Sequence, residues 1–202
     1  MHPKRKNDMR RTAYLVIITA AALLLASCTV SRKSTRRSGA SRVHQSSSSR
    51  NTGGSSASLG SAHKSNCSKL GVNASSTDNA RLYSECASWL GASYKYGGTT
   101  KSGVDCSGFV YMVYKAVFGK TLTRQSAGML TDNCTKITKN QLREGDLVFF
   151  RTDGKKSSTP NHVGIYLKEN KFIHASTSKG VVVSDLLQSY YVTNWITGGR
   201  VK

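Results

Sequence analysis

Several features that mark common protein classes are missing from this sequence. It has no internal repeat, which excludes a solenoid or a propeller. Its five cysteines include no C-x-x-C pair, so their spacing gives no zinc-binding pattern, and we expect neither a metal nor another cofactor. The mainly apolar run of residues 13–26 is shorter than the roughly 20 residues of a transmembrane helix. With 202 residues, the chain has room for one ordinary domain plus extensions.

Residues 1–27 are typical of a secretory signal. Basic residues precede the apolar run and small residues follow it. The ending L-A-S-C resembles the lipobox of bacterial lipoproteins, which implies that Cys28 becomes the lipidated N-terminus and that acyl chains anchor the protein to a membrane. Thr29 stands where aspartate usually signals inner-membrane retention, so we expect an outer-membrane location facing the periplasm. An ordinary signal peptide and an uncleaved anchor are the alternatives.

Acidic residues are also missing from residues 29–76, which carry eight basic ones. This stretch is otherwise rich in serine, glycine and alanine and cannot bury enough apolar surface to order itself. We therefore expect residues 28–76 to form the lipidated N-terminus and a flexible linker. Residues 77–202, with seventeen basic and nine acidic residues, form the expected domain with a net charge of +8. For an exported chain this charge indicates anionic lipids and cell-wall polymers as partners, and not nucleic acid.

Lipidation of Cys28 would leave four thiols in the mature chain. Export permits disulfides. One bridge among Cys67, Cys86 and Cys134 is therefore possible, and the sequence does not select the pair.

Helices are expected first in the domain and strands later. Apolar periodicity predicts a helix over residues 78–90, capped by Thr77 or Asp78 and ended by Gly91, and a second helix from Cys106 to Gly119. Turn signals and apolar runs predict strands at residues 147–151, 162–167, 172–176, 180–186 and 195–202. This order predicts an α+β domain with N-terminal helices packed on an antiparallel sheet.

One cysteine lies where a glycine-rich loop meets the second helix, in GGTTKSGVDCSGFV. A thiol at a helix N-terminus or beside a histidine has a lowered pKa and can act as a nucleophile. Cys106 has the first environment by local sequence, and we expect the glycines before it to leave an open approach. Taken alone, however, Cys106 could be a small buried hydrophobic residue.

The second environment requires His162 or His174, which are the only histidines after His63. Side chains alternate faces along a strand. The two histidines share a face only if the turn at Glu169 and Asn170 has an odd length or a bulge, because a strict two-residue turn would separate them. In the favourable register Cys106 attacks a carbonyl carbon, His162 moves the proton to the leaving amine, and His174 orients His162.

An oxyanion could be held near the start of the second helix. The backbone N–H groups of Cys106 or Ser107 are candidate donors, and Tyr94, twelve residues upstream of the cysteine, is another. Structural roles remain open for these residues, since Tyr94 could simply pack and Asp105 could simply cap the helix.

The motifs YKYGGTTKSGVDCSGFV, LREGDLVFF, HVGIYL and FIHAS resemble those of the NlpC family of papain-like cell-wall cysteine peptidases, most of all its murein endopeptidase lipoproteins. The resemblance covers residues 78–201. It implies a papain-like fold with Cys106 as nucleophile, His162 as base and His174 as the third polar residue. It also implies that Tyr94 is the family tyrosine and that Asp105, Ser107 and Arg124 shape the substrate groove. Thr123 stands where a proline often precedes that arginine, which weakens the last assignment.

The implied reaction is hydrolysis of an amide in peptidoglycan stem peptides or their cross-bridges, by a monomer without cofactors. Two alternatives share the fold: a non-catalytic module that binds wall peptides, and a lipid acyltransferase. The complete set of one cysteine and two histidines argues against the first. The loop before Cys106 argues against the second.

Overall fold

The computed structural model describes residues 53–202, and the side chains of residues 60–202. The expected signal segment, Cys28 and much of the expected linker lie outside the described residues. Within the described part, no helix is long and apolar enough to cross a membrane. The helical elements are α1 (Gly53–Lys69), α2 (Ala80–Trp89), α3 (Cys106–Phe118), α4 (Ser126–Gly128), the π-helical turn η1 (Met129–Asn133), the 3₁₀ turn η2 (Lys139–Gln141) and α5 (Ser189–Thr193). The strands are β1 (Thr99–Thr100), β2 (Gly103–Val104), β3 (Cys134–Ile137), β4 (Leu147–Phe150), β5 (His162–Tyr166), β6 (Lys171–Ser176), β7 (Gly180–Asp185) and β8 (Trp195–Val201).

Helix α1 occupies residues 53–69, where the sequence predicts part of a flexible linker. Its C-terminal turn leads into the main hydrophobic core through Cys67, Leu70 and Val72, which are all buried. Composition averaged over residues 28–76 conceals these few apolar side chains among many polar ones. The ordered part of the chain therefore begins before residue 77.

Helix α2 confirms the first predicted helix, but its cap differs. The side chain of Asn79 accepts a hydrogen bond from the backbone N–H of Leu82 at 3.1 Å, so Asn79, and neither Thr77 nor Asp78, caps the helix. An N-cap side chain satisfies a backbone donor that has no partner within the helix. The apolar face of α2 is buried at Leu82, Tyr83, Cys86 and Trp89.

Helix α3 has the predicted bounds. It begins at Cys106 and ends at Gly119, whose φ of 65° is the left-handed conformation that glycine adopts without strain. Asp105 caps its N-terminus by accepting the N–H of Gly108 at 2.5 Å. This cap fixes the start of the helix and so places Cys106 in its first turn.

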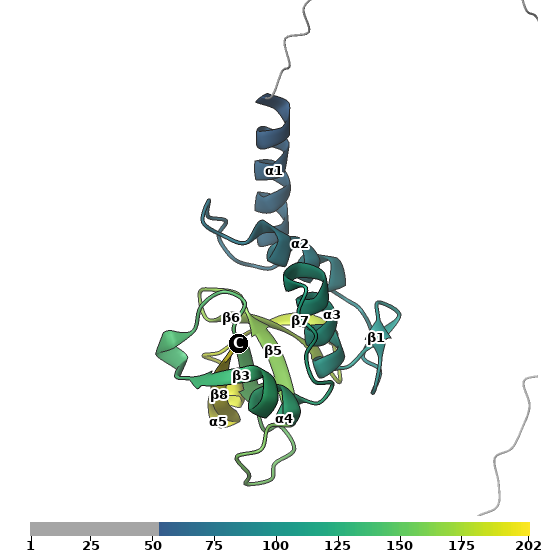
Figure 1. The fold of residues 1–202 in the computed structure, drawn as a ribbon, viewed down its shortest axis with the longest axis vertical. Coiled ribbons are helices and arrows are strands. Elements are labelled where there is room, and N and C mark those ends of the chain that lie inside the picture. Colours follow the sequence, from purple (N-terminus) through teal and green to yellow (C-terminus); the bar gives the residue numbers. More distant parts are fainter. Residues whose placement is uncertain (1–52) are drawn as a thin grey trace, which may run out of the picture. The chain divides into compact units, whose positions relative to one another are not determined.

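Six antiparallel strands form the sheet, in the order β3-β8-β4-β5-β6-β7. Helix α3 lies against β5 and β6, and Figure 1 shows it together with α2 beside the strands. The fold is α+β, as predicted. Strand β3 and the small β1–β2 pair were not expected, because their short segments lack an alternating apolar pattern.

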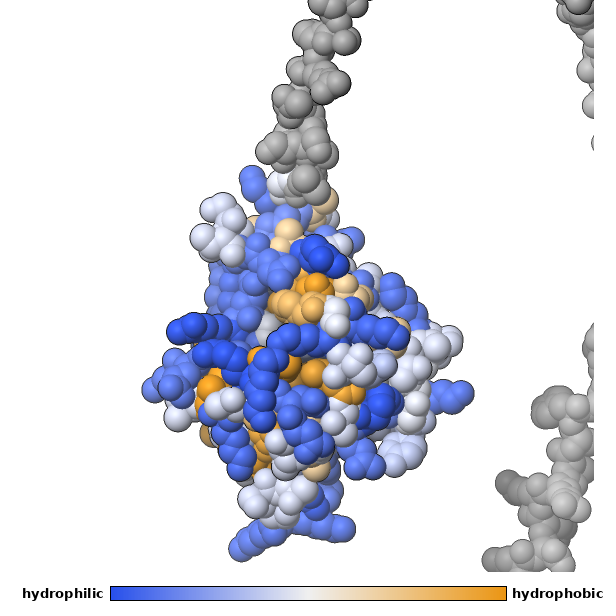
Figure 2. Space-filling model, in the orientation of Figure 1, coloured by the Kyte–Doolittle hydropathy of each residue, from blue (hydrophilic) through white to orange (hydrophobic). Residues whose placement is uncertain are grey.

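Alternation along the strands gives the sheet two apolar faces. Phe149 belongs to the main core under the helices, whereas its neighbour Phe150 packs on the other face with Phe172, Tyr191 and Trp195. The face of the molecule in Figure 2 is mostly hydrophilic, with small hydrophobic areas between polar side chains. Strand β5 is thus covered on both sides, which restricts the movement of residues at its ends.

The four cysteines of the described region all carry free, buried thiols: Cys67, Cys86, Cys106 and Cys134. None of the bridges that the sequence left open is formed among them.

Candidate active site

The register of the β5–β6 hairpin decides whether the two histidines can meet. Ile165 pairs with Ile173 and Tyr166 with Phe172, so even-numbered residues lie opposite even-numbered ones. Residues of one parity share a face of a sheet. The hairpin therefore has the register that the proposed site requires.

The turn reaches this register by adding a bulge to a two-residue turn. Glu169 and Asn170 both have positive φ, 54° and 60°, as in a type I′ turn. Lys171 donates to the carbonyl of Lys168 at 2.8 Å and accepts from the N–H of Leu167 at 2.9 Å. Leu167 and Lys168, which directly follow β5, thus both face Lys171 of β6, and this is a β-bulge. The bulge reverses the parity that a strict two-residue turn would give.

His162 and His174 consequently make a direct hydrogen bond. The Nε2 atom of His162 lies 2.8 Å from Nδ1 of His174, with the two rings perpendicular. Both side chains are buried, with exposed fractions of 8% and 2%. Because Nε2 of His162 is engaged, its Nδ1 is the nitrogen left for another partner.

Gly164 makes room for this pair. A Cβ atom at Gly164 would lie 2.8 Å from Cδ2 of Phe172, 2.9 Å from the carbonyl oxygen of Ile173 and 3.1 Å from Cβ of His174. The space beside Gly164 is therefore filled by neighbours on β6. Only a residue without a side chain fits between the strands here.

Two hydroxyl groups contact the outer nitrogen of His174. Its Nε2 atom lies 3.0 Å from Ser184 Oγ and 3.1 Å from the Tyr191 hydroxyl, and the two oxygens are 3.2 Å apart. Sequence reasoning missed both residues. Ser184 has the same parity as His174 on the neighbouring strand, but the register of β6 with β7 cannot be read from the sequence alone.

Cys106 is the first residue of α3 and is 8% exposed. The backbone N–H groups of Val163, Ser107 and Cys106 itself are near enough to the sulfur to lower the pKa of the thiol. Val163 directly follows His162 in the chain. The thiol therefore lies near the backbone at the beginning of β5, where His162 is the first residue.

Burial sets the protonation of the site. It raises the pKa of the Cys106 thiol, and the negative charge of Asp105 raises it further, while the N–H groups of Val163 and Ser107 lower it by less. The sequence predicted that the helix N-terminus would lower the pKa of this thiol, but the effect of burial is larger. Burial also lowers the pKa of His162 to about 4, and burial together with His162 lowers that of His174. At neutral pH the thiol and both imidazoles are therefore neutral.

A polar cluster lies next to the thiol. The guanidinium of Arg124 lies 3.4 Å from Asp105 Oδ2 and 3.3 Å from Ser107 Oγ. Ser107 Oγ donates to the Arg124 carbonyl at 2.6 Å and contacts Asp105 Oδ1 at 3.0 Å. All three predicted groove residues are therefore brought together, and Asp105 also serves as the helix cap.

The glycine-rich loop packs tightly on this cluster. A Cβ atom at Gly108 would lie 2.1 Å from the carbonyl oxygen of Gly98, and one at Gly98 would lie 2.3 Å from the carbonyl oxygen of Gly103. Gly97, with φ of 72°, donates to Asp105 Oδ2 at 2.8 Å. The glycines thus allow close contact between loop and helix, in addition to bordering the opening at Cys106.

A cavity of about 490 Å³ runs past the thiol. Its lining residues are Tyr94, Tyr96, Gly97, Asp105, Cys106, Ser107, Arg124, Gln125, Ser126 and Asn161. His162 and His174 instead border a separate cavity of about 70 Å³. Tyr94 is partly buried and close enough to Cys106 for its own pKa to be raised, first by burial and then by that thiol. Five of the predicted residues, namely Tyr94, Asp105, Cys106, Ser107 and Arg124, thus line one groove, whereas the two histidines border the other cavity and Cys28 lies outside the described residues.

Comparisons with known proteins identify the family of the chain. The profile of the NlpC/P60 family matches residues 91–200. The chain is 39% identical over 122 residues to the murein DD-endopeptidase MepS/murein LD-carboxypeptidase of Escherichia coli (strain K12), covering 60% of this chain and 62% of that relative. It is 41% identical over 122 residues to the "Probable endopeptidase NlpC homolog" of Haemophilus influenzae, covering 60% and 61%. The chain thus spans about six-tenths of the length of these relatives.

A solved structure supports the same grouping. A crystal structure of an NlpC/P60 family protein from Bacillus cereus ATCC 10987 matches with a TM-score of 0.55 and 28% identity, covering 63% of this chain and 41% of that one. The family profile includes the cysteine, both histidines and the whole of the six-stranded sheet except its last residue. The chain belongs to the NlpC/P60 family.

Proposed function

We propose that the protein is a cysteine peptidase that hydrolyses amide bonds in peptidoglycan stem peptides or cross-bridges. The observation that carries the proposal is the hydrogen bond between His162, the first residue of β5, and His174 on β6, together with a thiol at Cys106 that lies near the backbone of Val163. A thiol, an imidazole base and a group that orients the base are the parts that nucleophilic acyl transfer needs. The murein-directed names of the relatives support the substrate class.

The contacts of the two histidines allow more than one arrangement of protons, and the proposed reaction uses the following one. Nε2–H of His162 donates to Nδ1 of His174, and Nε2–H of His174 donates to the hydroxyls of Ser184 and Tyr191. In this arrangement Nδ1 of His162 carries a free lone pair that can accept the thiol proton. The hydroxyls thus act as positioning groups that favour the useful tautomer of His174.

The neutral ground state implies that proton transfer accompanies attack. As the Cys106 sulfur bonds to the carbonyl carbon, its proton moves to His162, which then gives it to the leaving amine. Water then attacks the acyl-enzyme while His162 takes one of its protons, and His162 returns this proton to the departing sulfur, so that the carboxyl product leaves and the thiol is restored. Backbone N–H groups of Cys106 and Ser107 and the hydroxyl of Tyr94 would stabilise the oxyanion.

Arg124 and Asp105 would orient the substrate in the groove. Stem peptides carry carboxylates, which a guanidinium can bind through two hydrogen bonds, and their free amines can pair with Asp105. The basic character of residues 77–202, at +8, would attract the anionic wall.

We also propose that residues 1–27 are a signal peptide and that Cys28 carries the lipid that holds a monomeric enzyme at the outer membrane, facing the periplasm. The L-A-S-C ending supports this proposal. Labelled palmitate should enter the wild-type chain and not Cys28→Ala. Equal labelling of both chains would contradict it.

Digestion of purified muropeptides by the full chain tests the activity. Wild-type protein should release products whose masses identify the cleaved amide, and Cys106→Ala should release none. Identical products from both proteins would mean that another group or a contaminant cuts. Binding of muropeptides by the wild type without any product would favour the alternative of a wall-peptide-binding module. Transfer of an acyl group from added phospholipid would favour the acyltransferase.

A further inference from the structure

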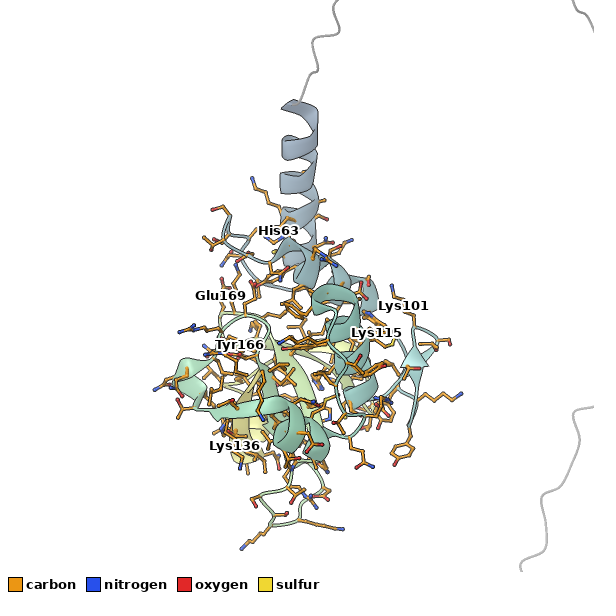
Figure 3. All side chains as sticks on the ribbon, in the orientation of Figure 1. His63, Lys101, Lys115, Lys136, Tyr166 and Glu169 are labelled. Atoms are coloured by element: carbon orange, nitrogen blue, oxygen red, sulfur yellow. The ribbon has the colours of Figure 1, made fainter. Side chains whose placement is uncertain are left out.

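Three metal-ligating side chains meet at a place remote in sequence from the catalytic motifs. His63 and Cys67 are one turn apart on α1, and residues four apart lie on the same face of a helix. Asp78 reaches them from the segment just before α2, which Asn79 caps. Figure 3 shows His63 on the last turns of α1, above the turn that carries Glu169. In residues 60–202 this is the one group of three such side chains whose ligand atoms all lie within 4.8 Å of one another.

The spacing of the three atoms matches a tetrahedral site. Nε2 of His63 lies 3.1 Å from Oδ2 of Asp78 and 3.6 Å from Sγ of Cys67, and the sulfur lies 4.0 Å from the same oxygen. Tetrahedral zinc with bonds of about 2.0–2.3 Å holds its ligand atoms roughly 3.3–3.6 Å apart. Shifts of a few tenths of an ångström would bring all three atoms to bonding distance of one ion.

The cluster is enclosed by the protein. Cys67 is 1% exposed, and the side chains of His63 and Asp78 are 12% and 6% exposed. The ring of Tyr83 meets that of His63 edge-on, with centroids 5.5 Å apart. Three protein ligands leave one of the four tetrahedral positions of zinc for water, and burial holds these three side chains in place.

Lys168 places a positive charge at this cluster. Its Nζ atom lies 2.8 Å from both carboxylate oxygens of Asp78, and the Ser75 N–H donates to Oδ2 at 2.7 Å. An ion bound at Oδ2 would repel this ammonium, which could keep its contact with Oδ1. Lys168 is therefore a competitor for Asp78, and a thiolate plus a carboxylate supply the two negative charges that balance a divalent ion.

We propose that His63, Cys67 and Asp78 form a structural zinc site. One thiolate, one imidazole and one carboxylate suit zinc better than magnesium or calcium, which prefer oxygen ligands alone. Water completes the tetrahedron. The ion ties the end of α1 to the segment before α2, and so holds α1 against the domain independently of the peptidase reaction. The C-x-x-C spacing missing from the sequence is not needed, because the fold supplies the third ligand.

Binding is measured on the full-length chain in detergent, stripped with chelator and carrying Cys106→Ala. This background removes the candidate nucleophile, so that its thiolate cannot contribute to zinc binding. Zinc titration followed by metal analysis should give one bound equivalent that His63→Gln and Cys67→Ser both lose. Cys134→Ser is the matched control: it removes a buried thiol outside the cluster and should keep the equivalent. Circular dichroism shows which variants are folded.

Three further measurements do not require the His63 and Cys67 variants to fold. Cobalt in place of zinc should give the absorption of thiolate-to-cobalt charge transfer and a tetrahedral visible spectrum. Free zinc at about one hundred times Kd should raise the Tm by roughly 5–10 °C. Lys168→Met should bind zinc several-fold more tightly.

The proposal is overturned if the Cys106→Ala chain binds no zinc, if its cobalt form lacks the thiolate band, or if folded Cys67→Ser keeps the equivalent. Unchanged or weaker zinc binding by Lys168→Met would show that the ion is not held at Asp78. None of these outcomes depends on peptidase activity, so the two proposals fail separately.

Discussion

Nε2 of His162 and Nδ1 of His174 lie 2.8 Å apart across two neighbouring strands, although twelve positions separate them in the sequence. The contact exists because the bulge at Leu167 and Lys168 gives both histidines the same face. A buried imidazole hydrogen-bonded in this way has one fixed orientation. The pair is thus a consequence of a turn that is remote from any reacting atom.

His174 should matter for the rate more than for substrate binding. Replacing His174 by alanine removes the acceptor for His162 Nε2–H, and we expect kcat on defined stem peptides to fall roughly 10²- to 10⁴-fold with KM little changed. His174→Asn, which keeps an acceptor oxygen, should retain more activity than His174→Ala. Equal losses in the two variants, with both folded, would count against an orienting role.

Ser184 and Tyr191 should each be able to replace the other as the hydrogen-bond partner of His174 Nε2. Each hydroxyl can accept Nε2–H of His174 alone, so Ser184→Ala or Tyr191→Phe should lower kcat only a few-fold. The double variant leaves that donor without a partner in a buried site, and its loss should exceed the product of the single losses. A double-mutant cycle on kcat measures this coupling. If the effects of the two substitutions on the activation free energy simply add, the hydroxyls do not act together to orient His174.

Gly164→Ala should disturb the histidine pair. The added methyl would press on Phe172 at 2.8 Å and on His174 at 3.1 Å, and such overpacking destabilises proteins by about 1–3 kcal/mol. We expect a lower Tm and a lower kcat. Gly60→Ala on α1 is the matched control, since nothing lies within 4 Å of its Cβ position and alanine favours a helix. A Gly164→Ala protein with unchanged Tm and kcat would contradict the close approach.

Stability should fall with acid through the titration of His162. Its pKa is about 4 in the folded protein and near 6.5 when unfolded, so between these values the unfolded chain binds more protons. The contribution of the neutral imidazole is therefore complete above pH 6.5 and is lost as the pH falls towards 4. For His162 alone the change is about 3 kcal/mol. Urea unfolding at several pH values should show it.

The matched control for this prediction is His162→Gln, which has no group titrating in that range. The variant should lose less stability than the wild type between pH 6.5 and 4. Parallel curves for the two proteins would mean that the imidazole is not held neutral by burial.

Local sequence predicted much of the fold and the members of the candidate site. The helix beginning at Cys106 and ending at Gly119, and the strands β4 to β8, follow from apolar periodicity and turn residues, which act over a few positions. The motifs around Cys106, His162 and His174 pointed to the family that the comparisons then identified. These features were readable because each depends on near neighbours in the chain.

Contacts between distant segments were not readable in this way. The helix at residues 53–69 depends on the burial of Cys67 and Leu70 in a core made by other elements. The average composition of the segment does not reveal this burial. The cap at Asn79 leaves Asp78 free to meet His63, and the register of β6 with β7 brings Ser184 to His174. Such pairings depend on packing and strand register over long sequence separations.

The sequence by itself thus determined which residues could do chemistry: a thiol at a helix start and two histidines on predicted strands. Only the tertiary structure decided how they are arranged and charged. The bulge in the β5–β6 turn selected the face that the histidines share, because one added residue reverses the alternation of a strand. Burial made thiol and imidazole neutral, because the cost of desolvating a charge exceeded what the amides at the helix start return.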